Sequence, residues 1–217
     1  DSAGPAEPEP EPEPQDIVLG KPPFALLLNA GFMNGTGELQ SLAMGSVLAY
    51  GDTYKLLLTP DKNCYLYVFE QNMGQFRMLF PVSFSDYGES AGVNPVLAEE
   101  ELELPVEDEV FSLEPAGPAM DGNQDSGLII IASSGQNQEL EHIIQNIKEM
   151  DVAGNLARHR YWKVRLSQYL SLEIAAHTTE RETLFFPWRG VNRLMQMEAY
   201  QFTLDESQMF FLPVTIR

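Results

Sequence analysis

The sequence is poor in cysteine, in long apolar runs and in evenly spread basic residues. The single cysteine, Cys64, excludes an intrachain disulfide and a cysteine-based zinc site. The apolar runs span only a few residues, whereas a transmembrane helix needs about 20, so we expect no transmembrane segment. No Lys or Arg lies between Arg77 and Lys148, and nucleic-acid binding needs a basic face. We therefore expect no nucleic-acid partner. Without a Gly-rich phosphate loop, no cofactor is expected either.

Acidic residues, by contrast, are abundant and gather in two segments. The net charge is −19, and residues 1–16 hold six acids and no base, while residues 86–125 hold twelve acids and no base. Glu and Pro alternate in the first segment, which is typical of an extended chain because proline restricts the backbone and like charges repel. We predict that residues 1–16 are a disordered Glu/Pro-rich tail or linker and that residues 17–217 form a single β-rich domain.

Most of that domain has the pattern of short strands. Turn signals at Pro60-Asp61-Lys62-Asn63 and Asn72-Met73-Gly74 separate three β-branched and aromatic runs. The region 54–80 is therefore predicted to be a meander of three consecutive antiparallel strands. The continuous apolar run Gly127–Ser133 predicts a buried central strand. Further strands are predicted at 25–29, 46–50, 101–104 and 109–113.

The last third of the chain combines one helical pattern with several alternating ones. Apolar residues at helical spacing between Leu140 and Met150, preceded by Asn137 as a candidate N-cap, predict an amphipathic helix. Even-numbered positions from Trp162 to Ala176 are apolar except Gln168, which predicts a long strand with a break near that residue. Met195–Leu204 and Gln208–Ile216 are predicted to form a final hairpin. The fold class expected is mainly β, a β-sandwich or partly open barrel of antiparallel strands with one amphipathic helix packed on it.

Several short motifs also occur in a recognisable order. Val47–Asp52 reads as a strand followed by Gly-Asp, and Tyr65–Phe69 is followed by Gly74 and then by Leu79-Phe80-Pro81. With the later segments Glu103-Leu104-Pro105 and Leu128–Ser133, these motifs resemble the bacterial DUF4384 family, a domain of unknown function, over roughly residues 42–150. The resemblance implies a mainly β domain with a late helix, in a periplasmic, cell-surface or extracellular bacterial protein. It supplies no catalytic residues, and residues 151–217 form a C-terminal β extension outside it.

One group of side chains has the spacing of metal ligands. Asp121, Asn123 and Asp125 follow the D-x-N-x-D pattern, whose oxygen atoms can converge on calcium. The EF-hand continuation fails, because Ser126 stands where glycine is needed and Ala132 stands where the bidentate Glu should be. A polar surface turn is the alternative interpretation of this segment.

Two segments are candidates for binding a partner protein. A predicted loop around Pro187 contains Phe185, Phe186, Trp188 and Arg189. Exposed aromatic and Arg side chains dominate the binding energy of protein interfaces. The same cluster could instead plug the end of a β-sandwich. Glu99, Glu100 and Glu101 could attract a basic partner, or could form a solvated edge that discourages aggregation.

No residue pattern points to catalysis. Ser133-Ser134-Gly135 lacks the first glycine of a nucleophile elbow, and the three histidines are scattered. The sequence favours a non-enzymatic binding or assembly module of a bacterial cell-envelope or extracellular complex, with a protein partner. A small-molecule or calcium-sensing domain is the alternative, and a hydrolase with an unrecognised site is a third hypothesis.

Overall fold

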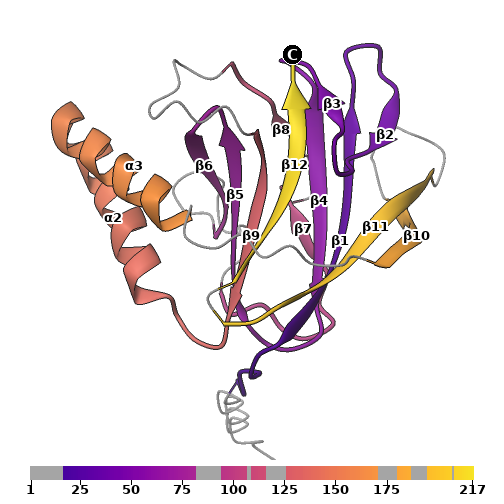
Figure 1. The fold of residues 1–217 in the computed structure, drawn as a ribbon, viewed down its shortest axis with the longest axis horizontal. Coiled ribbons are helices and arrows are strands. Elements are labelled where there is room, and N and C mark those ends of the chain that lie inside the picture. Colours follow the sequence, from indigo (N-terminus) through magenta and orange to yellow (C-terminus); the bar gives the residue numbers. More distant parts are fainter. Residues whose placement is uncertain are drawn as a thin grey trace, which may run out of the picture.

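The computed structural model of the protein describes residues 17–81, 94–106, 109–115, 126–170, 180–186, 195–206 and 208–217. Within these residues the chain is mainly β, with two packed sheets and two helices beside them (Figure 1). The described strands do not close into a barrel. The predicted fold class is therefore confirmed in its sandwich form.

Sheet one contains the first long strand of the domain at its centre. Its strands are ordered β10-β11-β1-β4-β7, with β2 paired to β1 and β8 paired to β4. All of these pairings are antiparallel. The strands are β1 (Phe24–Met33), β2 (Leu39–Ser41), β4 (Thr53–Pro60), β7 (Leu102–Leu104), β8 (Phe111–Ser112), β10 (Glu180–Phe186) and β11 (Met195–Leu204).

Sheet two has the order β3-β12-β9-β5-β6. Its strands are β3 (Val47–Leu48), β5 (Tyr65–Asn72), β6 (Gln75–Phe80), β9 (Ser126–Ser133) and β12 (Met209–Ile216). Every residue of β9 is buried, as predicted for a central strand. Met73 and Gly74, both at positive φ, form the turn between β5 and β6, which is the two-residue connection that suits the twist of a hairpin.

The main core lies between the two sheets. Leu26 and Leu28 on β1 pack with Leu66 and Val68 on β5, and all four side chains are fully buried. Apolar side chains that alternate along strands of both sheets therefore meet in one layer, where their removal from water supplies most of the stabilisation.

A second apolar layer lies on the outer face of sheet two. Helix α2 (Gln138–Val152) and helix α3 (Leu156–Leu170) form a hairpin there, which stands beside β5 and β6 in Figure 1. Phe69 and Ile131 of the sheet pack with Leu140 of α2 and Leu166 of α3. Sheet two is therefore buried on both faces, which explains why β9 shows a continuous apolar run instead of alternation.

The predicted three-strand meander is wrong in its pairing. β5 and β6 do form a hairpin, but β4 belongs to sheet one and pairs with β1, while β5 pairs with β9 in sheet two. The turn after Pro60 carries the chain from one sheet to the other. Asp61 stabilises this turn, because its carboxylate accepts a hydrogen bond from the Ala25 backbone N–H at 2.8 Å. Alternation shows which face of a strand is buried but does not show which strand is its neighbour.

The predicted final hairpin is wrong for the same reason. β11 pairs with β1 and β10, whereas β12 pairs with β9 and β3, so the two strands lie in opposite sheets. Their facing side chains meet across the core, where the rings of Phe202 and Phe210 stack with centroids 3.9 Å apart. The predicted loop at Phe185 is also corrected, because Phe185 and Phe186 end strand β10.

The largest correction concerns the long strand predicted from Trp162. The structure places helix α3 at 156–170, and residues 171–176 lie outside the described part of the chain. Trp162, Leu166 and Leu170 are four residues apart, so they satisfy both an alternating pattern and one stripe of a helix. Val164 distinguishes the two patterns. It would be buried with them in a strand, but it is 40% exposed on the helix.

Candidate functional site

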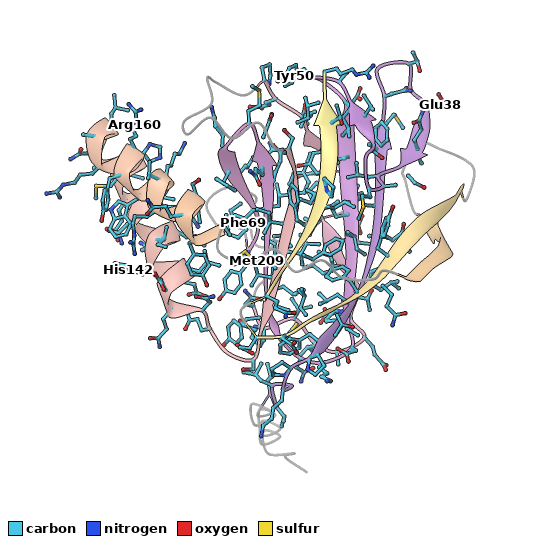
Figure 2. The ribbon with its side chains drawn as sticks, viewed as in Figure 1. Glu38, Tyr50, Phe69, His142, Arg160 and Met209 are labelled. Atoms are coloured by element: carbon cyan, nitrogen blue, oxygen red, sulfur yellow. The ribbon has the colours of Figure 1, made fainter. Side chains whose placement is uncertain are left out.

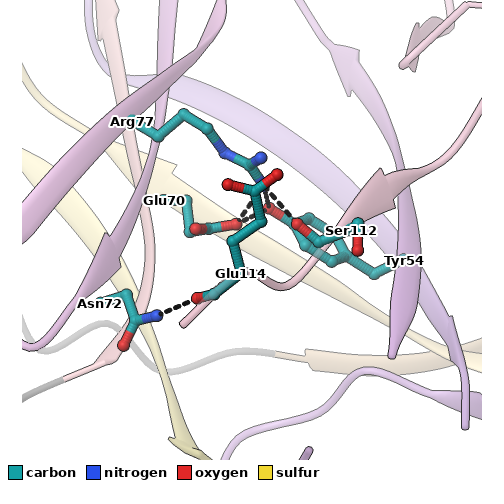
Figure 3. A network of polar contacts seen from close by, with 6 residues as sticks. All are labelled: Tyr54, Glu70, Asn72, Arg77, Ser112 and Glu114. Carbon is teal, nitrogen blue, oxygen red and sulfur yellow. Dashed lines mark hydrogen bonds and ion pairs between the residues drawn. The ribbon is translucent and has the colours of Figure 1, made fainter. Parts of the chain in front are cut away.

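A buried polar network joins the two sheets at one end of the sandwich. Tyr54 on β4 donates a hydrogen bond to Glu70 Oε2 on β5. Arg77 Nη2 on β6 donates to the same carboxylate oxygen at 2.6 Å, to Tyr54 Oη at 3.2 Å and to the Ser112 carbonyl at 3.1 Å (Figure 3). Strand pairing alone does not connect sheet one to sheet two, so these contacts act as a polar cross-link.

The network becomes more exposed from Tyr54 towards Arg77. Tyr54 is 1% exposed, while the Arg77 side chain is 37% exposed. Phe111 covers the network from β8, with its ring 5.4 Å from that of Tyr54 and 5.6 Å from the Arg77 guanidinium carbon. Arg77 therefore reaches from a buried ion pair to the protein surface.

The protonation states follow from this burial. Burial raises the pKa of Tyr54 well above its ordinary value, and the neighbouring Glu70 carboxylate adds to the increase. Burial acts to lower the pKa of Arg77, but attraction to Tyr54 and Glu70 outweighs it and raises that pKa. At neutral pH Tyr54 is a neutral hydrogen-bond donor and Arg77 is a cation.

Beside Arg77 lies a cavity between strand β6 and the helical hairpin, which we call the side cleft. Its polar part has a volume of about 400 Å³, within the range of small-ligand sites. Arg77 and Glu114 contribute to one wall, and His159 and Lys163 of α3 contribute from the helices. Figure 3 shows Glu114 in front of the Glu70–Arg77 pair.

The side cleft continues into a smaller apolar part of about 100 Å³. Phe76, Ile147 and Lys163 line both parts, so the two cavities are neighbours. The deeper lining is apolar and includes Met78 of β6 and Leu166 of α3. The side cleft as a whole thus combines charged groups of both signs with an apolar floor.

Two polar atoms of the cleft wall have no hydrogen-bond partner among the described residues. They are Asn72 Oδ1 and Arg77 Nε, and both are shielded from solvent. Asn72 is 5% exposed, and its amide nitrogen donates to the Glu114 carbonyl at 3.0 Å. A buried acceptor or donor without a partner costs free energy, so the wall retains unused hydrogen-bonding capacity.

The helical hairpin is attached to sheet two through the N-terminus of α2. Tyr67 Oη on β5 accepts a hydrogen bond from the Asn137 backbone N–H at 3.0 Å and donates to Glu141 Oε1 at 2.7 Å. Asn137 caps the helix as predicted, because its Oδ1 accepts from the Leu140 N–H at 3.1 Å. Burial, together with the hydrogen bond to Glu141, raises the pKa of Tyr67 well above its ordinary value.

The outward side of the hairpin carries a second notable set of residues, which we call the hairpin surface. Helix α3 holds four of the chain's thirteen Lys and Arg residues and no acid. Large apolar side chains are exposed among them, and Figure 2 shows Arg160 at the outer end of the hairpin, away from the sheets. The hairpin surface consists of Val152, Leu156, Arg158, Arg160, Tyr161, Val164 and Arg165.

Few of the residues predicted from the sequence as binding sites lie near these features. Glu99, Glu100 and Glu101 are exposed before β7, and the Glu99 backbone N–H donates to the Pro60 carbonyl at 2.8 Å. Phe185 and Phe186 belong to the edge strand β10. Trp188 and Arg189 lie outside the described residues, as do the calcium candidates Asp121, Asn123 and Asp125. Among the described residues, no group of three or more His, Cys, Asp or Glu side chains could hold a metal ion.

The structure brings forward residues that the sequence patterns did not. In the sequence Arg77 is the last basic residue before a long acidic region, but no motif around it indicates a function. The strand interpretation hides Lys163 and Arg165, since it assigns them to the solvated face of a strand, while Arg158 and Arg160 precede that strand. The signal that could have found them is the composition of 156–170, with four Lys or Arg residues and no acid in an acidic chain.

Comparison with known proteins does not place the chain in a family. No family model matches it, and no curated protein or solved structure shows significant similarity. Of the helices in the described part of the chain, none has the length and apolar character needed to cross a membrane.

Proposed function

We propose that this chain is a non-enzymatic binding module of a bacterial cell-envelope or extracellular protein complex, and that the hairpin surface is its binding face. The observation that carries the proposal is the composition of that surface. Val152 is 92% exposed, Leu156 80% and Tyr161 58%, and three arginines lie among them. Aromatic and Arg side chains dominate protein interfaces, and exposed apolar groups gain free energy when a partner covers them.

The partner expected is an acidic segment of another protein that also carries apolar side chains. α3 contributes four positive charges and no negative one, and Arg165 already pairs with Glu139 at 3.5 Å. Carboxylates match the planar fork of arginine in both charge and geometry. Outside the acid-only segments the rest of the chain is nearly neutral, so the local positive charge of α3 can steer such a partner.

A membrane and a nucleic acid fit this surface less well. An amphipathic helix binds lipid through its apolar face, but Leu166 and Leu170 of α3 are already buried against the sheet. Four Lys and Arg residues on one helix, with Val152 and Leu156 exposed beside them, form too small and too apolar a face to neutralise a phosphate backbone.

Site-specific photo-crosslinking in cells that make the protein tests this proposal. Tyr161 is replaced by p-benzoylphenylalanine, and Tyr50, which is 41% exposed, receives the same replacement as a matched control. We expect one protein to crosslink at position 161 and not at position 50, through a segment rich in Asp and Glu. Adding Arg160→Glu and Arg165→Glu should abolish that crosslink, because charge reversal repels an acidic partner.

Two results would overturn the proposal. One is an equal crosslinking pattern at positions 161 and 50, which would mean that the hairpin surface has no preferred partner. The other is a crosslinked segment that carries no excess of acidic residues, or a crosslink to lipid that survives the charge reversal.

A further inference from the structure

We propose that the side cleft binds a zwitterionic amino acid with an apolar side chain. This site is separate from the hairpin surface and does not depend on the function proposed there. Its walls come from β6, from the segment after β8 and from the two helices. The cleft contains charged groups of both signs, an apolar floor and polar atoms without a hydrogen-bond partner among the described residues. Each of these features matches one part of such a ligand.

The charges of the cleft match the two ends of a zwitterion. Lys163 faces the cleft from α3 and Arg77 from β6, and both are donors suited to a carboxylate. Glu114 lines the same space and is exposed, so it can receive an ammonium group. Glu70 already accepts hydrogen bonds from Arg77 and Tyr54, so among the described residues that line the cleft Glu114 is the negative group available to the ligand.

The apolar side chain of the ligand would rest on Phe76 and Ile147. These residues line both the polar and the apolar parts of the cleft. A side chain that enters between them reaches the smaller cavity of about 100 Å³, beside Met78 and Leu166. Filling such a space restores van der Waals contacts and removes apolar surface from water.

The unpartnered atoms of the wall also fit this ligand. Asn72 Oδ1 is an acceptor and Arg77 Nε is a donor. An ammonium group supplies hydrogens and a carboxylate supplies lone pairs, so the ligand carries both kinds of group that these two atoms lack. A fatty acid supplies only the carboxylate and offers no donor to Asn72 Oδ1 or to the Glu114 carboxylate, so it should bind less tightly.

Thermal unfolding and titration calorimetry with the whole chain test the site. The probes are L-leucine and L-phenylalanine, with N-acetyl-L-leucine, L-leucinamide and the dipeptide Leu-Leu as comparisons. A ligand that binds only the folded state must raise the unfolding midpoint. We expect leucine or phenylalanine to raise it, and the acetylated and amidated forms to bind about tenfold more weakly or worse, since each loses one charged contact. The dipeptide distinguishes a free amino acid from the end of a peptide.

Variants assign the binding to the cleft. Lys163→Met and Glu114→Gln should each weaken leucine binding about tenfold, whereas Lys21→Met and Glu100→Gln, at exposed positions elsewhere, should leave it unchanged. Absence of any midpoint shift or heat with both amino acids would overturn the proposal. Equal binding of the acetylated and amidated forms, or stronger binding of the dipeptide, would also overturn it. So would unchanged binding in the two cleft variants.

Discussion

The polar cross-link between the sheets gives the sharpest stability prediction, through the variant Arg77→Met. Methionine keeps much of the apolar stem of arginine but removes the cation from Glu70, whose side chain is 11% exposed. Removing one partner of a fully buried ion pair costs about 3–5 kcal/mol. Because the Arg77 side chain is 37% exposed, water can reach the carboxylate, and we expect a smaller loss of about 2–3 kcal/mol.

Two further variants separate the charge from the hydrogen bonds. Tyr54→Phe leaves the Glu70–Arg77 pair in place and should cost about 1.5–3 kcal/mol, the value of one hydrogen bond to a charged group. The double variant Arg77→Met with Glu70→Met removes both charges and should be more stable than Arg77→Met alone, because no buried carboxylate is left without its cation.

Urea unfolding followed by circular dichroism measures these differences, provided the slope of free energy against urea stays constant. For a domain of this size the loss in Arg77→Met corresponds to a fall of about 5–10 °C in the thermal midpoint. The reasoning is refuted if Arg77→Met costs less than about 1 kcal/mol. It is also refuted if the double variant loses as much stability as Arg77→Met and Glu70→Met, each measured alone, added together, since coupled residues should not be additive.

Three other predictions follow from single sites. Gly127→Ala should destabilise by about 2 kcal/mol or more, because its Cβ would clash with the backbone carbonyl oxygen of Leu212 on β12. Gly135→Ala, with no atom within 4 Å of the added Cβ, should be neutral in the same urea assay. Tyr67→Phe should lower the free energy of unfolding by about 2 kcal/mol, because it removes the hydrogen bonds that attach α2 to the sheet. It should also speed hydrogen exchange in α2 more than in β1, and an equal increase in both elements would contradict this attachment. Burial raises the pKa of the Cys64 thiol from 9.0 to about 12, so unfolding should become easier between those pH values as the unfolded thiol ionises first. Cys64→Ala should flatten that part of the stability profile, and an identical slope in both proteins would rule out the thiol as its source.

The local elements could be predicted from the sequence because their patterns depend on neighbouring residues only. The β5–β6 hairpin follows from the Asn72-Met73-Gly74 turn, and the structure has Met73 and Gly74 at the positive φ values that this turn needs. The buried run of β9 and the Asn137 cap of α2 are confirmed in the same way. Each signal lies within a few residues of the feature that it predicts.

The pairing of strands could not be predicted, because it depends on residues far apart in the chain. β4 and β5 are joined by a short turn, as are β11 and β12, and a short turn normally indicates a hairpin. In this fold both turns cross between sheets, so that Leu58 faces the core from sheet one and Leu66 from sheet two. The buried face of each strand is the same in either arrangement, and for this reason the alternation did not distinguish them.

The misassigned helix α3 explains why the sequence interpretation missed both candidate sites. As a strand, 162–170 would place Lys163 and Arg165 on one face and Trp162, Val164 and Leu166 on the other. A helix redistributes the same residues over three directions. Leu166 packs on the sheet, Lys163 turns to the side cleft and Val164 joins the hairpin surface. A strand has two faces, one towards the core and one towards solvent. A helix presents side chains all round its axis, so one segment can contribute to the core, to a ligand cleft and to a partner surface. If the charge reversal on α3 removes partner binding while Lys163→Met weakens only ligand binding, the two sites are separate functions of one helix.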